Sequence, residues 1–481
     1  MDNLKEKTAK GLLWSGIANG AQQLLGLAFG IILGRLLSPS DYGMVAMITI
    51  FSLVANALQE SGFRMALANL KEPRHEDYNA VFWFNIGVGA GLYALLFLAA
   101  PLIGRYYHTP EVVPLCRYAF LSIVLSALGS AQAAYIYKNL RAKQQAKSTI
   151  AATIASSCVG VGMALLGCSY WSLATQTLVF VGMNTLLLWH YSPWRPTVRG
   201  ITMEPVRRML PFSVKVLATN ITTHVNNNVL NILLGHYFSP HATGNFNQAY
   251  QWTSKCYYLL QGMLGQVSQP ALVSMGDDAA RQLNAFRKLV RFTAFLSFPL
   301  LLGLALVARE FIVVTITEKW LESAELMQML CVSGATIPLS SLCANMVVSK
   351  GRSGSYFWCT LGLGLTQIVA LVMVWPWGLR TMVMVHVGIN VVWLLVWYAL
   401  VRHLTGYRLW HFAMDTLPFA LAAAGVMVAT HWLTAAIGSL WLLLVVRVVV
   451  AAVMYFAVMK LARVQILDEC LTFLLKRQRR R

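Results

Sequence analysis

The sequence predicts an all-α polytopic membrane protein with about 14 transmembrane helices. Three observations support this fold class. Of 481 residues, 57% are hydrophobic and only 12% are charged, a composition too apolar for a soluble chain of this length. Apolar segments of about 20 residues, long enough to cross a bilayer, recur along most of the chain. A motif placed between such segments occurs near residue 40 and again near residue 240.

The predicted spans follow one another with short polar connections. The basic N-terminus precedes an apolar run too long for a signal peptide, so we expect this run to remain as the first span. Glycines inside the segments are tolerated in a bilayer and do not weaken the prediction. The predicted spans are residues 11–36, 43–66, 79–102, 114–136, 148–167, 171–191, 209–236, 244–272, 289–308, 325–349, 355–377, 380–402, 412–433 and 438–460.

The repeated motif indicates two related halves. Residues 33–43 read LGRLLSPSDYG and residues 234–244 read LGHYFSPHATG, which share the pattern L-G-x-x-x-S-P-x-x-x-G. Each copy joins two predicted spans, so the same membrane hairpin is used twice. Because six spans form each half, both halves begin on the same side of the membrane and are parallel repeats.

This repeat predicts the domain organisation. A stretch with three prolines and four arginines, residues 192–208, has no hydrophobic run and separates the halves as a linker. The predicted domains are an N-terminal six-helix bundle (1–191), a cytoplasmic linker (192–208), a C-terminal six-helix bundle (209–402), two additional transmembrane helices (403–460) and a basic amphipathic cytoplasmic tail (461–481) on the inner leaflet.

The net charge of +20 is distributed unevenly along the chain. Most Lys and Arg residues lie in or next to loops on the side of the N-terminus, which favours a multi-pass protein with both termini in the cytoplasm. The charge therefore specifies topology, and we expect no nucleic-acid partner. The exceptions in outer loops are Arg35, Arg105, Arg117, Arg309, Lys319 and Arg380.

Polar side chains inside the spans are concentrated on the four helices that flank the two copies of the motif. In the seventh span, four of them recur at i, i+4, i+7 and i+11, which places them on one helical face. Such faces either line a central hydrophilic cavity or form hydrogen bonds between helices. The residues are Asn19 and Gln22 in span one, Asn56, Gln59, Glu60 and Arg64 in span two, Asn220, His224, Asn227 and Asn231 in span seven, and Gln251 and Lys255 in span eight.

Charged residues in these spans point to an anionic ligand. Lys255 lies near the middle of its span with no carboxylate in the same helix, so a bound phosphate or pyrophosphate or an ion-pair partner elsewhere would suit it. Lys215 and Arg64 bind the same anion or extend to the inner interface. Glu60 is the candidate ion-coupling residue or the partner of Arg64 at i+4.

Three other polar residues have expected structural roles. We expect Arg447, in the last span, to pair with a carbonyl group or a lipid headgroup. Asp41, in the first copy of the motif, is expected to act as a loop and cap residue. Asp415 lies at the end of a span and is a further carboxylate at the membrane.

Motifs of soluble enzymes are missing from the sequence. It contains no P-loop, no G-x-S-x-G motif and no His/Cys cluster with the spacing of metal ligands. No connection between spans is long enough for a catalytic domain. We therefore expect a protein that is not an enzyme and that needs no cofactor and no metal. The eight cysteines occur singly and are expected to be small buried hydrophobes.

Four segments of the chain form a recognisable set: KGLLWSGIANGAQQLL, GRLLSPSDYGMVAM, ESGFRMALA and TEKWLESAELMQML. They resemble the polysaccharide transporter family, the Wzx-like lipid-linked oligosaccharide flippases of the multidrug/oligosaccharidyl-lipid/polysaccharide (MOP) exporter superfamily. The resemblance implies a V-shaped pair of six-helix bundles that moves undecaprenyl-diphosphate-linked oligosaccharide repeat units across the inner membrane by alternating access. The products would be O-antigen, capsule or exopolysaccharide. The cations would then bind the lipid diphosphate and the amides the sugar hydroxyls.

Other functions remain as alternatives at this stage. A cation-coupled multidrug exporter of the same superfamily is disfavoured because span one has no acidic residue. A membrane glycosyltransferase or polymerase would be expected to have a large outer loop, which is missing. Membrane lipids are expected partners, and whether polymerase and glycosyltransferases of the pathway join the protein is left open.

Overall fold

The computed structural model describes residues 2–60, 63, 66–67, 70–198, 201–275, 278–464 and 466–467. Its regular secondary structure is helical throughout these ranges. The helices are α1 (Asp2–Leu36), α2 (Pro39–Glu60), α4 (His75–Tyr106), α5 (Val112–Ala119), α6 (Leu121–Lys138), α7 (Ala142–Leu165), α8 (Trp171–Tyr191), α9 (Glu204–Tyr237), α10 (Pro240–Ser274), α11 (Ala279–Leu306), α12 (Ala308–Ile316), η1 (Glu318–Trp320), α13 (Leu321–Ser349), α14 (Ser353–Val374), η2 (Trp375–Trp377), α15 (Leu379–Thr405), α16 (Leu409–Leu433) and α17 (Leu440–Leu461).

The predicted fold class, an all-α polytopic membrane protein, is confirmed. Within the described residues, 11 helices are long and apolar enough to cross a membrane. α1, α9 and α10, where three more spans were predicted, are not among them. These are three of the four helices with the predicted polar faces. A total of about 14 spans therefore stays a prediction.

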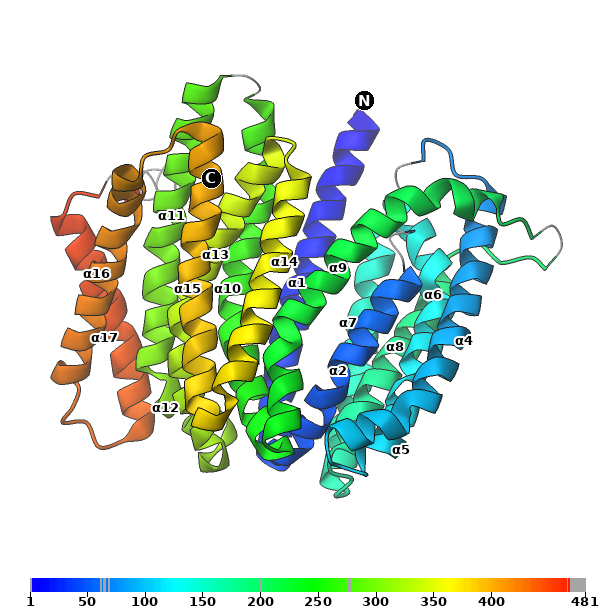
Figure 1. The fold of residues 1–481 in the computed structure, drawn as a ribbon, viewed down its shortest axis with the longest axis horizontal. Helices are drawn as coiled ribbons and strands as arrows, with labels where there is room; N and C mark the ends of the chain where they lie inside the picture. Colours follow the sequence, from blue (N-terminus) through cyan, green and yellow to red (C-terminus); the bar gives the residue numbers. More distant parts are fainter. Residues whose placement is uncertain are drawn as a thin grey trace. The chain divides into compact units, whose positions relative to one another are not determined.

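Contacts divide the chain into two compact units, unit 1 (Met1–Gly244) and unit 2 (Asn245–Arg481). In unit 1, α4, α6 and α8 lie side by side, α7 packs against α8 and α1, and α2 packs against α9 (Figure 1). α9 thus belongs to unit 1, and α10 begins in unit 1 and continues in unit 2. The domain boundaries expected at residues 191 and 209 come from the sequence repeat and remain a prediction.

The segment predicted to be a linker, residues 192–208, is partly helical. α9 begins at Glu204, four residues before the predicted end of the linker, because Pro205 suits the first helical turn. The preceding segment packs against the helices of unit 1. Trp194 is only 7% exposed, and the centre of its ring lies 5.9 Å from the centre of the Phe82 ring. The Thr197 amide donates to Asn79 Oδ1 at 2.9 Å.

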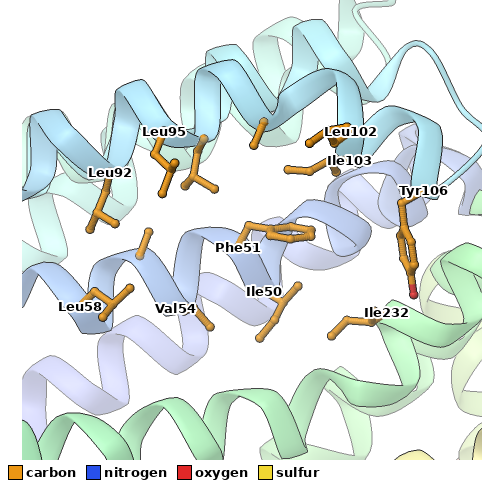
Figure 2. Close-up of a pocket in the computed structure, with 13 residues that line it drawn as sticks. Ile50, Phe51, Val54, Leu58, Leu92, Leu95, Leu102, Ile103, Tyr106 and Ile232 are labelled. Carbon is orange, nitrogen blue, oxygen red and sulfur yellow. The ribbon is translucent and has the colours of Figure 1, made fainter.

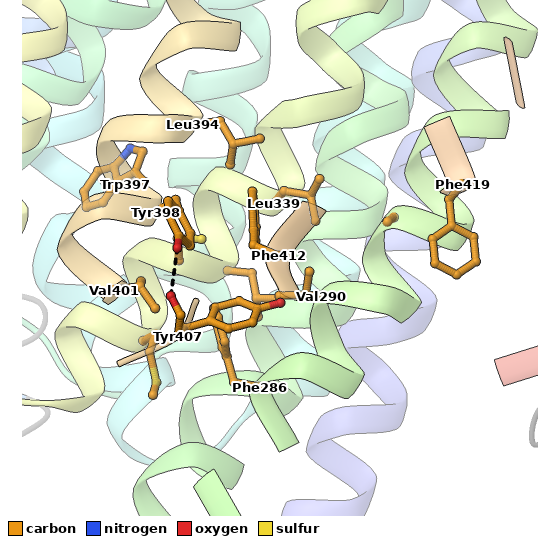
Figure 3. Close-up of a cluster of buried hydrophobic side chains, with 14 of the residues drawn as sticks. Phe286, Val290, Leu339, Leu394, Trp397, Tyr398, Val401, Tyr407, Phe412 and Phe419 are labelled. Carbon is orange, nitrogen blue, oxygen red and sulfur yellow. Dashed lines mark hydrogen bonds between the residues drawn. The ribbon is translucent and has the colours of Figure 1, made fainter. Parts of the chain in front are cut away.

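Unit 2 is organised around aromatic packing between α11, α15 and α16. Phe286, Tyr398, Tyr407 and Phe412 are buried in one cluster, and the Tyr398 hydroxyl donates to the Tyr407 carbonyl oxygen at 2.7 Å (Figure 3). The first residues of the predicted amphipathic tail, among them Leu467, pack on the same cluster. Residues 468–481 of that tail lie outside the described part of the chain.

Candidate functional site

The first copy of the repeated motif is a capped helix start. Ser38 donates to Asp41 Oδ2 through its amide at 2.8 Å and through its hydroxyl at 2.7 Å. Asp41 Oδ1 also accepts a hydrogen bond from the Ser169 hydroxyl in the loop between α7 and α8. The predicted role of Asp41 as a cap is confirmed. In the second copy, Ser239 Oγ accepts from the Ala242 amide at 3.2 Å, so the serine fixes both helix starts.

The two copies of the motif contact each other through their backbones inside unit 1. A Cβ atom on Gly43 would lie 1.7 Å from the Pro240 carbonyl oxygen, and one on Gly244 would lie 1.8 Å from the Pro39 carbonyl oxygen. The two contacts are equivalent under exchange of the copies. No side chain fits at either glycine unless the backbone moves. The sequence contained the signal, since both glycines belong to the shared pattern, but it did not predict that the copies touch.

The predicted polar face of span seven lies on the single continuous helix α9, so the four residues keep their common face. Asn220 and Asn227 are exposed and His224 is partly buried. Asn231 is 3% exposed, and its Oδ1 has no hydrogen-bond partner among the described residues. The four polar residues therefore extend from an accessible part of α9 to a part that is packed inside unit 1.

The predicted polar residues of spans one and two lie in different environments. On α1, Asn19 is exposed and Gln22 is partly exposed. On α2, Asn56 is partly buried, whereas Gln59 is 0% exposed and lies next to Gly89 of α4. The expectation that Gln59 faces a cavity is therefore wrong, because α2 packs that face against α4.

Three of the predicted charged residues cannot be placed in the site. Arg64 lies outside the described residues, and only the backbone of Glu60 and Lys215 is described. Their proposed roles stay predictions. The backbone puts Glu60 in the last turn of α2 and Lys215 in the fourth turn of α9.

Lys255 is placed on α10 in unit 2, where it is partly buried. Its Nζ lies 4.4 Å from the centre of the Trp252 ring, a cation–π contact. No carboxylate in the described ranges pairs with it. Gln251, one turn earlier, is exposed. The structure thus assigns the α2 and α9 residues to one unit and the α10 residues Gln251 and Lys255 to the other.

Arg447 of α17 has the predicted carbonyl partner and, in addition, a buried carboxylate partner that was not predicted. Arg447 donates a hydrogen bond to the Leu306 carbonyl oxygen at 3.3 Å, which is the predicted kind of partner. It also donates to Glu310 Oε1 at 2.8 Å, which forms a buried ion pair. It further contacts Thr434 Oγ1 and His431 Nδ1, each at 3.2 Å. Glu310, on the short helix α12, was not recognised in the sequence as a membrane carboxylate because it follows a span next to another charged residue.

A second carboxylate is held by two arginines in unit 2. Asp415 accepts two bonds from Arg287, at 2.7 and 3.2 Å, and lies 3.3 Å from Arg291 Nε. The Tyr407 hydroxyl donates to the same carboxylate at 2.7 Å. Burial of the Tyr407 ring, together with this hydrogen bond, raises the pKa of its phenol. These contacts join α11 to α16 and leave Asp415 fully paired.

Comparison with known proteins gives one family and several relatives. A family described as "Polysaccharide biosynthesis protein" matches residues 32–325. The lipopolysaccharide biosynthesis protein WzxC of Escherichia coli K12 is 26% identical over 73% of this chain and 71% of its own length. The teichuronic acid biosynthesis protein TuaB of Bacillus subtilis 168 is 22% identical over 89% of both chains. The succinoglycan biosynthesis transport protein ExoT of Rhizobium meliloti 1021 is 23% identical over 81% of this chain and 76% of its own.

Solved structures share the fold at low sequence identity. The lipid II flippase MurJ, in an inward closed conformation, has a TM-score of 0.73 at 13% identity, covering 93% of this chain and 99% of that one. A multidrug resistance MATE transporter of the MOP superfamily, in an inward-facing conformation, has a TM-score of 0.65 at 16% identity, covering 80% and 94%. At these identities the likeness shows the fold alone.

Proposed function

Because this chain belongs to the polysaccharide biosynthesis protein family, we propose that it is a flippase for lipid-linked oligosaccharides. The resemblance predicted from the sequence is confirmed by this family and by its relatives, and the solved structures agree with it in fold. The substrate we propose is an undecaprenyl-diphosphate-linked repeat unit, moved across the inner membrane by alternating access. The names of three relatives, which concern lipopolysaccharide, teichuronic acid and succinoglycan, support a polysaccharide precursor as the substrate class.

The observation that carries the proposal is Lys255. A lysine partly buried in the middle of α10, a helix predicted to span the membrane, is costly unless an anion compensates its charge. The described residues supply an aromatic ring but no carboxylate. A diphosphate group would provide the missing negative charge, and we propose Lys215 and Arg64 as further anion-binding residues.

The amide-bearing faces support a sugar ligand. Sugar hydroxyls both donate and accept hydrogen bonds, and so do amide side chains. We therefore assign sugar binding to Asn19, Gln22, Asn56, Asn220, His224, Asn227, Asn231 and Gln251. Glu60 is proposed for ion coupling. Transport of this kind breaks no covalent bond, which agrees with a protein that is not an enzyme.

The test replaces the charge of Lys255 in cells that depend on this chain for surface polysaccharide. Lys255→Gln is expected to lower surface polymer roughly tenfold or more, since a lost bond to a charged group is worth about 1.5–3 kcal/mol. Lys255→Arg should retain most of the activity. Lys147→Gln, on an exposed side chain of α7, is the matched control. Normal polymer levels with a properly inserted Lys255→Gln protein would contradict diphosphate binding at this residue.

A further inference from the structure

An apolar pocket of about 590 Å³ lies inside unit 1 between α2, α4 and α9. Figure 2 shows side chains from α2 and α4 pointing into it from opposite sides. The lining side chains are hydrocarbon apart from the phenol oxygen of Tyr106 at one end. The volume is that of a ligand pocket and far exceeds the voids left between packed helices.

The pocket is elongated along the helices. On α4 its lining extends from Leu92 to Tyr106, which at 1.5 Å per residue is about 21 Å. Half of the hydrocarbon core of a bilayer is about 15 Å thick. The pocket is therefore longer than the hydrocarbon part of one leaflet, and it runs from the C-terminal end of α4 towards the middle of the membrane.

Polar rings lie at the Tyr106 end. The Tyr106 ring stacks on the His236 ring of α9, with ring centres 4.2 Å apart and ring planes at 14°. The His236 ring also stacks on the His108 ring, with centres 5.7 Å apart. His236 Nδ1 donates to the Tyr106 carbonyl oxygen at 2.6 Å, which leaves Nε2 for another group. Exposed Arg105 lies in the same last turn of α4. This end therefore offers ring nitrogens beside a hydrocarbon slot.

We propose that this pocket binds the polyprenyl chain of the lipid-linked substrate once it has crossed the membrane, with the diphosphate released from Lys255 and lying at the Tyr106, His236 and His108 rings. The inference rests on the proposed function, which supplies a ligand with one long hydrocarbon chain and an anionic head. A slot of this shape accepts a single chain, whereas a phospholipid brings two. The ring nitrogens at this end of the pocket can form hydrogen bonds to a phosphate.

The pocket adjoins the helices proposed to bind sugar and diphosphate. Val54 and Leu58 of α2 line it, and Asn56 lies between them in sequence. Ile232 of α9 lines it next to Asn231. A chain held here would run along the same two helices that carry the polar faces. The charge asymmetry of the loops predicts that the mouth is at the periplasmic end, so the pocket would hold the chain in the outer leaflet.

The test is binding of undecaprenyl phosphate to the full chain in nanodiscs of phosphatidylethanolamine and phosphatidylglycerol. Ala99 lines the pocket and is only partly exposed, so Ala99→Phe fills the slot without entering the packed core. Ala94→Phe makes the same change on an exposed site of α4 outside the lining. We expect Ala99→Phe to weaken binding about tenfold or more and Ala94→Phe to leave it unchanged.

The polar end of the pocket, at Tyr106, His236 and His108, is tested separately with His236→Phe, which keeps an aromatic ring and removes the ring nitrogens. It should weaken binding of undecaprenyl phosphate but leave binding of uncharged undecaprenol unchanged, whereas Ala99→Phe should weaken both. Equal loss of both ligands in His236→Phe would overturn the assignment of the phosphate. A photoreactive undecaprenyl phosphate should label α4 between Leu92 and Leu102 in the unmodified protein, so the test does not depend on variants that fold.

These outcomes separate the pocket from the proposed function. Unchanged binding in Ala99→Phe, or labelling confined to other helices, overturns the pocket as the chain site even if the cells still export polymer. Full competition by phosphatidylglycerol would show that an ordinary phospholipid occupies the slot and would also overturn it. Loss of the proposed function would instead appear as normal surface polymer in cells that lack this chain.

Discussion

Gly43 and Gly244 lie where any side chain would meet a carbonyl group of the other copy of the motif. The nearest atoms belong to the backbone, at 1.7 and 1.8 Å from an added Cβ, so a rotamer change cannot relieve the clash. Both helix starts are also fixed by their serines, Ser38 and Ser239. The residue type at each glycine is thus required by the neighbouring chain segment and not by helix geometry alone.

Alanine at either glycine should therefore destabilise the protein. Gly43→Ala and Gly244→Ala are each expected to lower the free energy of unfolding by at least about 2 kcal/mol, the cost of overpacking a rigid contact. Gly91→Ala on α4 is the control, because nothing lies within 4 Å of its added Cβ. Thermal unfolding of the purified variants in detergent measures the difference. Equal melting temperatures for all three variants would rule out the contact.

Arg447 and Glu310 form a buried ion pair, in which replacing one residue should also change the stability of the protein. Their side chains are only 8% and 6% exposed. Arg447→Met leaves the Glu310 charge buried without a partner and should cost about 3–5 kcal/mol. The double variant Arg447→Met/Glu310→Leu removes both charges and should regain most of that loss. Thermal unfolding of the single and double variants forms the test, and a double variant as unstable as the single one would contradict it.

At the level of elements, the turn between α15 and α16 connects two helices through one tyrosine. Tyr407 is 1% exposed, its carbonyl accepts from Tyr398 of α15, and its hydroxyl donates to Asp415 of α16. Arg287 brings α11 to the same carboxylate. Three helices of unit 2 are therefore fixed at one end by a single hydrogen-bonded group.

This turn should make the stability of the protein depend on alkaline pH. Burial, followed by the bond to Asp415, raises the pKa of Tyr407 above its ordinary value. In the unfolded chain a tyrosine loses its proton near pH 10, while the folded protein keeps it, so the stabilisation is full below about pH 10 and falls as the pH rises. Tyr407→Phe should lower stability at pH 8 by about 1 kcal/mol and reduce the decline between pH 9 and 11. An unchanged decline in Tyr407→Phe, measured by thermal unfolding, would contradict this account.

For the whole molecule, the charge asymmetry predicts both termini in the cytoplasm. A fluorescent protein fused after Arg481 should therefore fluoresce, because it folds in the cytoplasm. Alkaline phosphatase fused after Gly438, in the loop between α16 and α17, should be active because that loop is predicted to be periplasmic. The opposite pair of signals would reverse the topology and move the mouth of the apolar pocket to the inner leaflet.

The sequence by itself determined the membrane class, the helical windows, the family and the duplication. These properties are local, because hydropathy, helical periodicity and a short motif can be read within about 20 residues. The cap at Asp41 was predicted for the same reason, since its partner Ser38 is three residues away. The start of α9 at Glu204 was missed because a run of Pro and Arg concealed a first helical turn.

Only the tertiary structure decided which distant residues meet. The Arg447–Glu310 pair spans 137 residues, Arg287 and Asp415 are 128 residues apart, and Gly43 contacts the second copy of its own motif. Burial of Gln59 and the apolar pocket likewise depend on which helices α2 packs against. In a membrane, lipid tails are as apolar as the side chains that face a neighbouring helix, so a hydropathy pattern shows that a helix spans the bilayer but not which helix lies beside it.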